Sequence, residues 1–302
     1  MKYGELLKHG EDYLKEAGIH DAPYDARIIF EAVTGMDRSS LLGGGDLREA
    51  SETETDDFDR MLEKRASHIP VQYLTGEADF MGLRFYVNPD VLIPRFDTEF
   101  LVEEMMREID DGSEVLDMCT GSGCILLSLM KYKNRITGTG ADISGEALKV
   151  AERNEERIFG TGNAKPSEDG GVSEEPTGLH NAHEAVRWIR SDMFGDIDGR
   201  FDHIVCNPPY IRKDVIPTLD EEVKDHEPQL ALLGDDDGLK FYRIIARDAA
   251  EHLKPYGRLY LEIGYDQGAD VSALLKEAGY RDIEVMKDYG GNDRVVKAQY
   301  IP

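Results

Sequence analysis

An asparagine, two prolines and a tyrosine follow an apolar stretch in the second half of the chain, as Asn207-Pro208-Pro209-Tyr210. Two consecutive prolines fix φ at both positions and donate no backbone hydrogen bond, which leaves nearby carbonyl oxygens free to accept. The side-chain oxygen of Asn207 and a proline carbonyl can then each accept one hydrogen from a substrate –NH₂, while Tyr210 offers an apolar face. This Asn-Pro-Pro-Tyr motif could orient a planar amide or amine nitrogen toward an electrophilic carbon without a strong base. The alternative is a rigid turn that closes a strand.

The candidate cofactor site is a glycine-containing turn at residues 117–123, Asp-Met-Cys-Thr-Gly-Ser-Gly, followed by an apolar helical run. A strand, a glycine turn and a helix in this order let the backbone approach a ligand at the carboxyl edge of a parallel sheet. A dinucleotide site would need a third glycine at the position of Leu126. The turn therefore favours a nucleoside ligand without phosphates, and the alternative is a tight turn with no ligand. The candidate binding residues are Asp117, Cys119, Thr120, Gly121, Ser122 and Gly123.

Two acidic residues follow the next two strand-like runs. Asp142 comes 21 residues after Gly121, where a carboxylate could accept both hydroxyls of a ribose. Taken alone, Asp142 is better explained as a helix N-cap, but next to the glycine turn the ligand interpretation is favoured. Asp192 and Met193 follow the third strand-like run, where a polar edge contact and apolar packing could hold an adenine.

These groups need a sheet to position them, and the chain from Asp97 onward alternates helical and strand-like runs. Short apolar runs with helices between them predict a mostly parallel sheet that is covered on both faces. We also expect Thr98 to cap the first helix of this region. The strand-like runs are residues 114–118, 136–141, 185–189, 201–206, 258–263, 283–286 and 295–300.

The first part of the chain predicts helices instead. Apolar residues recur there at helical spacing as far as Ile69, and Ser51 with Glu54 is typical of a capping box. A short hairpin around Gly82 follows these helices. This part carries no cluster of residues that could do chemistry, so its most economical role is substrate docking.

These changes of pattern predict an α/β protein in which a small helical bundle precedes the domain with the sheet. We place the helical domain at residues 1–76, a hairpin linker at 77–96 and the catalytic domain at 97–302. Residues from about 160 to 184 are rich in Gly, Pro, Ser, Asn and acidic residues and have almost no large apolar ones. That composition indicates a solvated insertion outside the core.

The composition disfavours several classes of protein. The 302 residues carry a formal charge of −26, whereas a duplex-binding protein needs a surplus of Lys and Arg, so we expect no direct nucleic-acid binding. The start of the chain has no apolar targeting segment, and no stretch approaches the length of a spanning helix, so we expect no membrane partner. Cys119, Cys124 and Cys206 form no Cys-x-x-Cys or Cys/His cluster, which predicts free thiols, no metal site and a cytoplasmic location.

Together, these motifs resemble the class I (Rossmann-like) methyltransferases of the PrmC/HemK family, which modify a glutamine of peptide chain release factors. Two further blocks support the resemblance: residues 70–76, Pro-Val-Gln-Tyr-Leu-Thr-Gly, and residues 91–99, Val-Leu-Ile-Pro-Arg-Phe-Asp-Thr-Glu. Other matching blocks, in the family's order, are Glu227-Pro228 with Ala231-Leu232, Glu262-Ile263-Gly264 with Gln267, and Asp293-Arg294.

The resemblance implies a seven-stranded sheet and transfer of a methyl group from S-adenosylmethionine to the glutamine amide nitrogen in the Gly-Gly-Gln loop of a release factor. The helical domain would engage the release factor. The Asn-Pro-Pro-Tyr motif would hold the glutamine amide, and Arg95 and Phe96 would bind substrate near the mouth of the site. The cofactor would be lined by the turn residues named above and by Asp142, Asp192, Met193 and Asn207.

The chain departs from the family pattern at Phe96, which stands in place of a proline, and at Cys119, which stands in place of a glycine. From Cys119 we predict that this backbone position does not need a positive φ.

Two other functions stay open at this point. A methyltransferase for the exocyclic amine of adenine in DNA or RNA would share the Asn-Pro-Pro-Tyr motif, but it should carry a basic groove or a separate target-recognition region. A non-catalytic adaptor that binds a translation factor would predict damage at the cofactor turn, where Gly121, Gly123 and Asp142 are all present.

Overall fold

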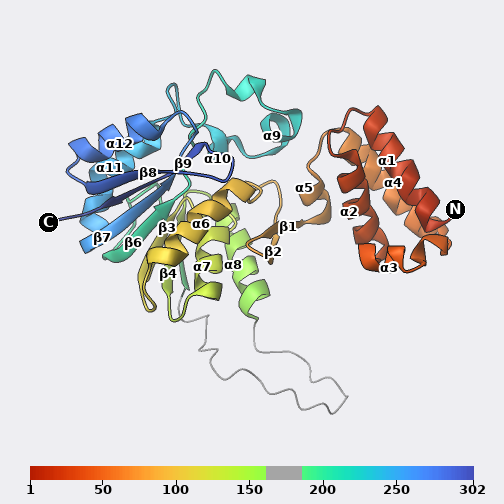
Figure 1. The fold of residues 1–302 in the computed structure, drawn as a ribbon, viewed down its shortest axis with the longest axis horizontal. Coiled ribbons are helices and arrows are strands. Elements are labelled where there is room, and N and C mark those ends of the chain that lie inside the picture. The colour runs from red at the N-terminus through yellow and green to blue at the C-terminus, as the bar shows by residue number, and fades with distance from the viewer. Residues whose placement is uncertain (161–185) are drawn as a thin grey trace, which may run out of the picture. The chain divides into compact units, whose positions relative to one another are not determined.

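The computed structural model describes residues 1–160 and 186–302 (Figure 1). The insertion expected at about 160–184 falls almost entirely outside the described residues. The described residues form two compact units. In sequence, these units are Met1–Glu77 with Leu219–Glu227, and Ala78–Thr218 with Pro228–Pro302.

The first unit is helical. Apolar side chains at helical spacing, among them Leu6 and Leu14, are buried in one cluster with Phe58. The capping box at Ser51 is confirmed, because Ser51 Oγ accepts from Glu54 N at 3.2 Å and Ser51 N donates to Glu54 Oε2 at 2.8 Å. The elements of this unit are α1 (Tyr3–Glu16), α2 (Ala22–Thr34), α3 (Arg38–Leu42), the 3₁₀ turn η1 (Gly45–Leu47), α4 (Glu52–Ala66), α5 (Val71–Thr75) and α9 (Glu221–His226).

A buried arginine joins three helices of this unit. Arg65 on α4 is 3% exposed; its Nε donates to Asp25 Oδ2 of α2 at 2.7 Å, and its Nη2 donates to Glu222 Oε1 of α9 at 2.5 Å. Burial raises the pKa of Asp25, although Arg65 opposes the shift. Since α9 lies far along the chain from α2 and α4, this ion-pair network ties segments distant in sequence into one unit.

The second unit is built on a seven-stranded sheet in the order β5-β4-β3-β6-β7-β9-β8. The strands from β5 to β7 are parallel to their neighbours, and only β9 runs antiparallel, to both β7 and β8. The expected mostly parallel seven-stranded sheet is therefore confirmed. Its strands are β3 (Glu114–Met118), β4 (Thr137–Asp142), β5 (Val186–Arg190), β6 (Phe201–Cys206), β7 (Leu253–Glu262), β8 (Arg281–Lys287) and β9 (Asp293–Gln299).

Helices cover both faces of this sheet (Figure 1). Strand residues alternate between two cores: Leu116 and Ile204 pack with residues of α11 and α12, whereas Val115 and Val205 pack with residues of α6 and α7. That alternation follows from the two-residue period of a strand. The helices of this unit are α6 (Phe96–Glu108), α7 (Cys124–Tyr132), α8 (Gly145–Phe159), η3 (Ile216–Thr218), α10 (Gln229–Leu232), α11 (Lys240–His252) and α12 (Gly268–Glu277).

The hairpin expected around Gly82 is present as a separate two-stranded sheet of β1 (Glu77–Phe80) and β2 (Leu83–Tyr86). Met81 and Gly82, which join the strands, have φ of +52° and +70°. Two successive positive φ values are typical of the tight turn whose twist matches a hairpin.

The start of α6 differs from the prediction. Arg95 is the N-cap residue, so the expectation that Thr98 caps this helix was wrong. Thr98 lies in the first turn and is only 2% exposed. Its hydroxyl is therefore available to the interior of the unit rather than to the helix end.

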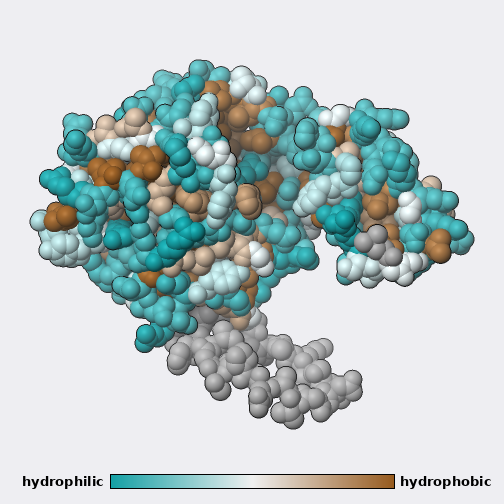
Figure 2. All heavy atoms as spheres, viewed as in Figure 1, coloured by the Kyte–Doolittle hydropathy of each residue, from teal (hydrophilic) through white to brown (hydrophobic). Residues whose placement is uncertain are grey.

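Polar residues make up most of the surface in Figure 2, as the charge of −26 requires. Within residues 1–160 and 186–302, no helix combines the length and the apolar character needed to cross a membrane.

Candidate active site

A cavity of about 480 Å³ opens at the carboxyl edge of the central sheet. The parallel neighbours β4, β3 and β6 end at this edge, so the segments that follow them converge there. Its size lies within the range of small-molecule sites. Of the residues predicted from sequence, the cavity is lined by Arg95, Cys119, Thr120, Gly121, Ser122, Asp142, Asp192, Met193, Asn207 and Pro209.

Five predicted residues are not among those that line the cavity. Asp117 and Gly123 lie in the turn beside it, and Pro208 and Tyr210 follow Asn207. Phe96 is 71% exposed at the start of α6. The roles assigned to these five residues stay predictions.

The glycine turn has the backbone conformation that its composition indicates. Gly121 and Gly123 have φ of +54° and +77°, a region that costs most other residues energy. Gly123 is the N-cap of α7, and a Cβ atom there would lie only 3.0 Å from the Trp188 side chain. Thr120 N donates to Ala141 O at 3.0 Å, which ties the turn to the end of β4.

The prediction that residue 119 does not need a positive φ was wrong. Cys119 has φ of +61°, and Met193 has φ of +49°. Cys119 Sγ lies 4.0 Å from Met193 Sδ, and both residues line the cavity. A side chain held in this region costs about 1 kcal/mol or more. Two strained residues thus meet at the candidate site, and a glycine at position 119 would avoid one of these costs.

Because Cys119 has a positive φ, we expect the variant Cys119→Gly to be more stable than Cys119→Ala by about 1 kcal/mol. Both variants lack Sγ and its contact with Met193, so the comparison isolates the backbone. Chemical denaturation of the two purified variants measures the difference. A more stable alanine variant would show that the backbone at this position is not strained.

Asp142 ends β4, and both of its carboxylate oxygens accept backbone hydrogen bonds. Gly121 N donates to Oδ2 and Ser144 N donates to Oδ1, each at 2.9 Å. Burial raises the pKa of Asp142. The cap of α8 is Ser144, whose hydroxyl accepts from Ala147 N at 3.1 Å. Since Ser144 caps the helix, Asp142 is not its N-cap, and the unused lone pairs of the carboxylate can accept from a ligand.

Asp117 is the penultimate residue of β3 and is fully buried. Its Oδ2 accepts from Thr120 Oγ1 at 2.6 Å, whereas its Oδ1 is buried without a hydrogen-bond partner in the described part of the chain. Burial raises the pKa of Asp117 to about 7. Asp117 therefore holds the turn from the side of the sheet through its hydrogen bond with Thr120.

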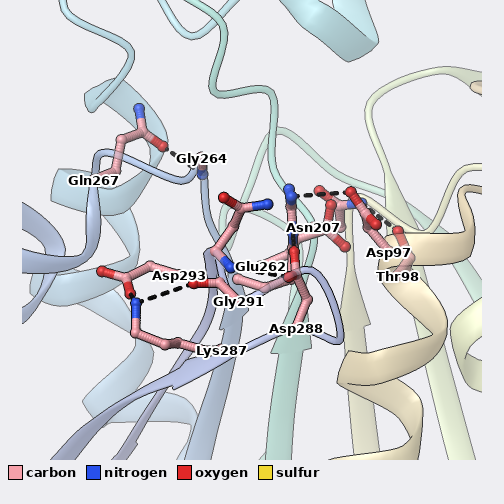
Figure 3. A network of polar contacts seen from close by, with 12 residues as sticks. Asp97, Thr98, Asn207, Glu262, Gly264, Gln267, Lys287, Asp288, Gly291 and Asp293 are labelled. Atoms are coloured by element: carbon pink, nitrogen blue, oxygen red, sulfur yellow. Dashed lines mark hydrogen bonds and ion pairs between the residues drawn. The ribbon is translucent and has the colours of Figure 1, made fainter.

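The Asn-Pro-Pro-Tyr motif continues from β6 and is held by hydrogen bonds at both ends. Asn207 Nδ2 donates to Thr98 Oγ1 at 3.3 Å, and Tyr210 Oη donates to Glu262 Oε1 at 3.4 Å. Gln267 Nε2 donates to the Tyr210 carbonyl oxygen at 3.1 Å. Asn207, Thr98, Glu262 and Gln267 appear in the polar network of Figure 3. Since Asn207 Nδ2 already has a partner, Oδ1 is the atom left to accept from a substrate.

Sequence reasoning assigned no site role to Glu262 and took Thr98 for a helix cap. Glu262 ends β7 and is 1% exposed, and burial raises its pKa to about 7. A carboxylate directly after an apolar strand is the same signal that identified Asp142, so it could have identified Glu262. The apolar wall of the cavity had no such signal; it includes Leu92, Ile125, Phe241 and Ile244.

Comparisons with known proteins identify relatives of this chain. Residues 5–76 match the family model described as the PrmC N-terminal domain. The release factor glutamine methyltransferase of Agrobacterium fabrum is 38% identical over 94% of this chain and 92% of its own length. That of Clostridium acetobutylicum is 36% identical over 99% of this chain and 98% of its own length.

The fold also matches a solved structure. A methyltransferase from Pyrococcus furiosus has a TM-score of 0.51 and 16% identity, over 74% of this chain and 91% of that chain. This likeness concerns the fold, whereas the relatives above share sequence over nearly the whole chain. The chain therefore belongs to the release factor glutamine methyltransferase family.

Proposed function

We propose that the chain transfers a methyl group from S-adenosylmethionine to the side-chain amide nitrogen of the glutamine in the Gly-Gly-Gln loop of peptide chain release factors. The observation that carries this proposal is the meeting of two kinds of group at one cavity. Asp142 and the glycine turn supply a nucleoside site, and Asn207 supplies an acceptor for a planar –NH₂ group.

The residues at the cavity fit this cofactor. Asp142 lines the cavity and can accept from the ribose hydroxyls. Asp192 and Met193 can hold the adenine by an edge contact and by packing. Leu126 stands where a dinucleotide site needs glycine, and this cofactor has no pyrophosphate. When bound, S-adenosylmethionine supplies a methyl group on a positively charged sulfur, which leaves as a neutral thioether.

The residues of the motif orient the acceptor nitrogen. Asn207 Oδ1 and a proline carbonyl can each accept one amide hydrogen, which fixes the plane of the glutamine amide. As the new bond to carbon forms, positive charge develops on the nitrogen, and these oxygen dipoles stabilise it until the nitrogen releases one proton to water. The amide nitrogen is a weak nucleophile, so this positioning is the main contribution that we assign to the protein.

Asp142→Ala is expected to raise the Kd for S-adenosylmethionine by about 100-fold, which corresponds to about 2.7 kcal/mol. The variant removes the ribose acceptor and also leaves Gly121 N without its partner. Isothermal titration with the cofactor alone measures this change. Asp202→Ala is the matched control, because Asp202 also accepts a backbone hydrogen bond, from Glu114 N at 2.9 Å, but does not line the cavity. An Asp142 variant that binds as tightly as the control would contradict the ribose assignment.

We propose further that residues 1–76 dock the release factor, that 77–96 link the domains and that 97–302 form the catalytic domain. The match of residues 5–76 to a distinct family model supports this division. We also propose a cytoplasmic location, because the proposed substrate is a translation factor. The charge of −26 supports a protein partner over nucleic acid.

The substrate class is tested by offering purified release factor, DNA and tRNA together, with S-adenosylmethionine labelled on its methyl group. We expect the label in the release factor. Label in DNA or tRNA would overturn the proposal in favour of an adenine methyltransferase, and no transfer to any of the three would favour the adaptor.

A further inference from the structure

We propose that Glu262 and Thr98 are positioning residues for methyl transfer, which together fix the direction in which the Asn207 amide points. The inference rests on the proposed function, because it assumes that Asn207 Oδ1 accepts from the substrate nitrogen. Thr98 lies in the first turn of α6 and Glu262 ends β7, so the two residues come from different elements (Figure 3).

A short chain of hydrogen bonds lies behind Asn207. Asn207 Nδ2 donates to Thr98 Oγ1 at 3.3 Å, and the Thr98 hydroxyl is in turn a hydrogen-bond partner of the Glu262 carboxylate. Thr98 and Glu262 are 2% and 1% exposed, so their groups cannot exchange these partners for bulk water.

The direction of these hydrogen bonds follows from the charge of Glu262. An ionised carboxylate has no hydrogen to donate, so the Thr98 hydroxyl must donate to Glu262 and accept from Asn207. Only the –NH₂ end of the Asn207 amide can donate to Thr98. The carbonyl end is then turned away from Thr98 and available to the substrate. Reversal of the bond between Asn207 and Thr98 would present a donor to the substrate –NH₂, which cannot bind there productively.

Several polar and charged groups surround Glu262. Glu262 also accepts from Tyr210 Oη at 3.4 Å, so this carboxylate contacts the tyrosine end of the Asn-Pro-Pro-Tyr motif directly and the asparagine end only through Thr98. Its Oε2 is buried and has no hydrogen-bond partner in the described residues. The titratable and charged groups that act on it from neighbouring elements are Asp97 of α6, Cys124 of α7, Tyr242 of α11, Arg294 of β9 and Tyr210.

Arg294 compensates the negative charge of Glu262 only in part, because Arg294 also pairs with two other acidic residues. Its Nη2 lies 2.9 Å from Asp97 Oδ2 and its Nε lies 3.1 Å from Asp288 Oδ2. Burial accordingly dominates and raises the pKa of Glu262 to about 7. A protonated Glu262 can donate to Thr98, so we expect the relay to lose its fixed direction below this pH.

The test is kcat for methyl transfer to a release factor, at saturating cofactor, in Glu262→Gln, Thr98→Val and the double variant. Each single variant should lower kcat by about 10- to 100-fold. The glutamine could donate to Thr98 where the carboxylate only accepts, and the valine could neither donate nor accept a hydrogen bond. The double variant should lose no more than the larger single loss, because both residues act through Asn207. The Kd for the cofactor should stay within about 3-fold of the parent in all three variants.

Two conservative variants serve as controls. Thr98→Ser keeps the hydroxyl and should restore kcat to within about 3-fold of the parent, which a merely structural defect would not predict. Glu284→Gln removes an exposed carboxylate on β8 that pairs with Lys297 away from the cavity, and should leave kcat unchanged. In the parent, kcat should rise with pH through about 7, and this step should be absent in Glu262→Gln.

The outcomes separate the two proposals. If the parent chain methylates a release factor but Glu262→Gln and Thr98→Val match it, the positioning inference fails alone. Losses that multiply in the double variant would also overturn it, since independent defects multiply. If the parent transfers no methyl group to a release factor, the proposed function fails and the inference fails with it.

Discussion

Asn207→Ala is expected to lower kcat for methyl transfer by roughly 10²- to 10³-fold, the effect of removing one oriented dipole from a site where charge develops. The variant removes Oδ1, which we assign to the substrate nitrogen, while the cofactor contacts of Asp142 and the glycine turn remain. The Kd for S-adenosylmethionine should therefore change little. Single-turnover kinetics and cofactor titration on the same preparation separate the two effects.

Asn134→Ala is the matched control for this prediction. Asn134 lies outside the cavity, where its Nδ2 donates to Asp111 Oδ2 at 2.9 Å, so its loss should leave kcat unchanged. An Asn207 variant as active as this control would refute the mechanism. A loss confined to cofactor binding would reassign Asn207 to the cofactor site.

Arg65→Ala is expected to lower the free energy of unfolding of the helical unit by about 3 to 5 kcal/mol. It would leave Asp25, which is 4% exposed, without its cation, and would remove the bond that holds Glu222 of α9. Burial already raises the pKa of Asp25, so protonation of this carboxylate limits the loss of stability. Hydrogen exchange on the full chain measures it, because protection should fall in α2, α4 and α9 and persist in the central sheet.

Arg60→Ala on the same helix provides the comparison. Arg60 is 62% exposed and pairs with Asp57 at 3.0 Å, so its loss should cost at most about 0.5 kcal/mol. Similar effects of the two variants would show that the buried network does not stabilise the unit. Protection lost in α9 alone would restrict the role of Arg65 to its bond with Glu222.

The carboxyl edge of the sheet is the part of the site that sequence could predict. Asp142 and Asn207 each follow a short apolar run, and parallel strands with intervening helices bring such positions to one edge. Gly121 and Gly123 were also informative, because glycine is the residue type that most readily adopts the positive φ found at both positions. In each case, the signal was local to a few consecutive residues.

The features that sequence could not predict depend on contacts between distant segments. Cys119 adopts φ of +61° in a turn that is tied to the end of β4, and its own residue type does not indicate this conformation. The bond from Arg65 to Glu222 joins residues 157 positions apart. Thr98 has a residue type typical of a helix cap, and only its burial beside Asn207 reveals a different environment.

The most direct test of the account is to map the modified residue by fragmentation mass spectrometry of a release factor incubated with the chain and S-adenosylmethionine. We expect one added methyl group on the side chain of the glutamine in the Gly-Gly-Gln loop, and none when that glutamine is replaced by alanine. A methyl group on any other residue, or an unmodified release factor beside a methylated nucleic acid, would contradict the account.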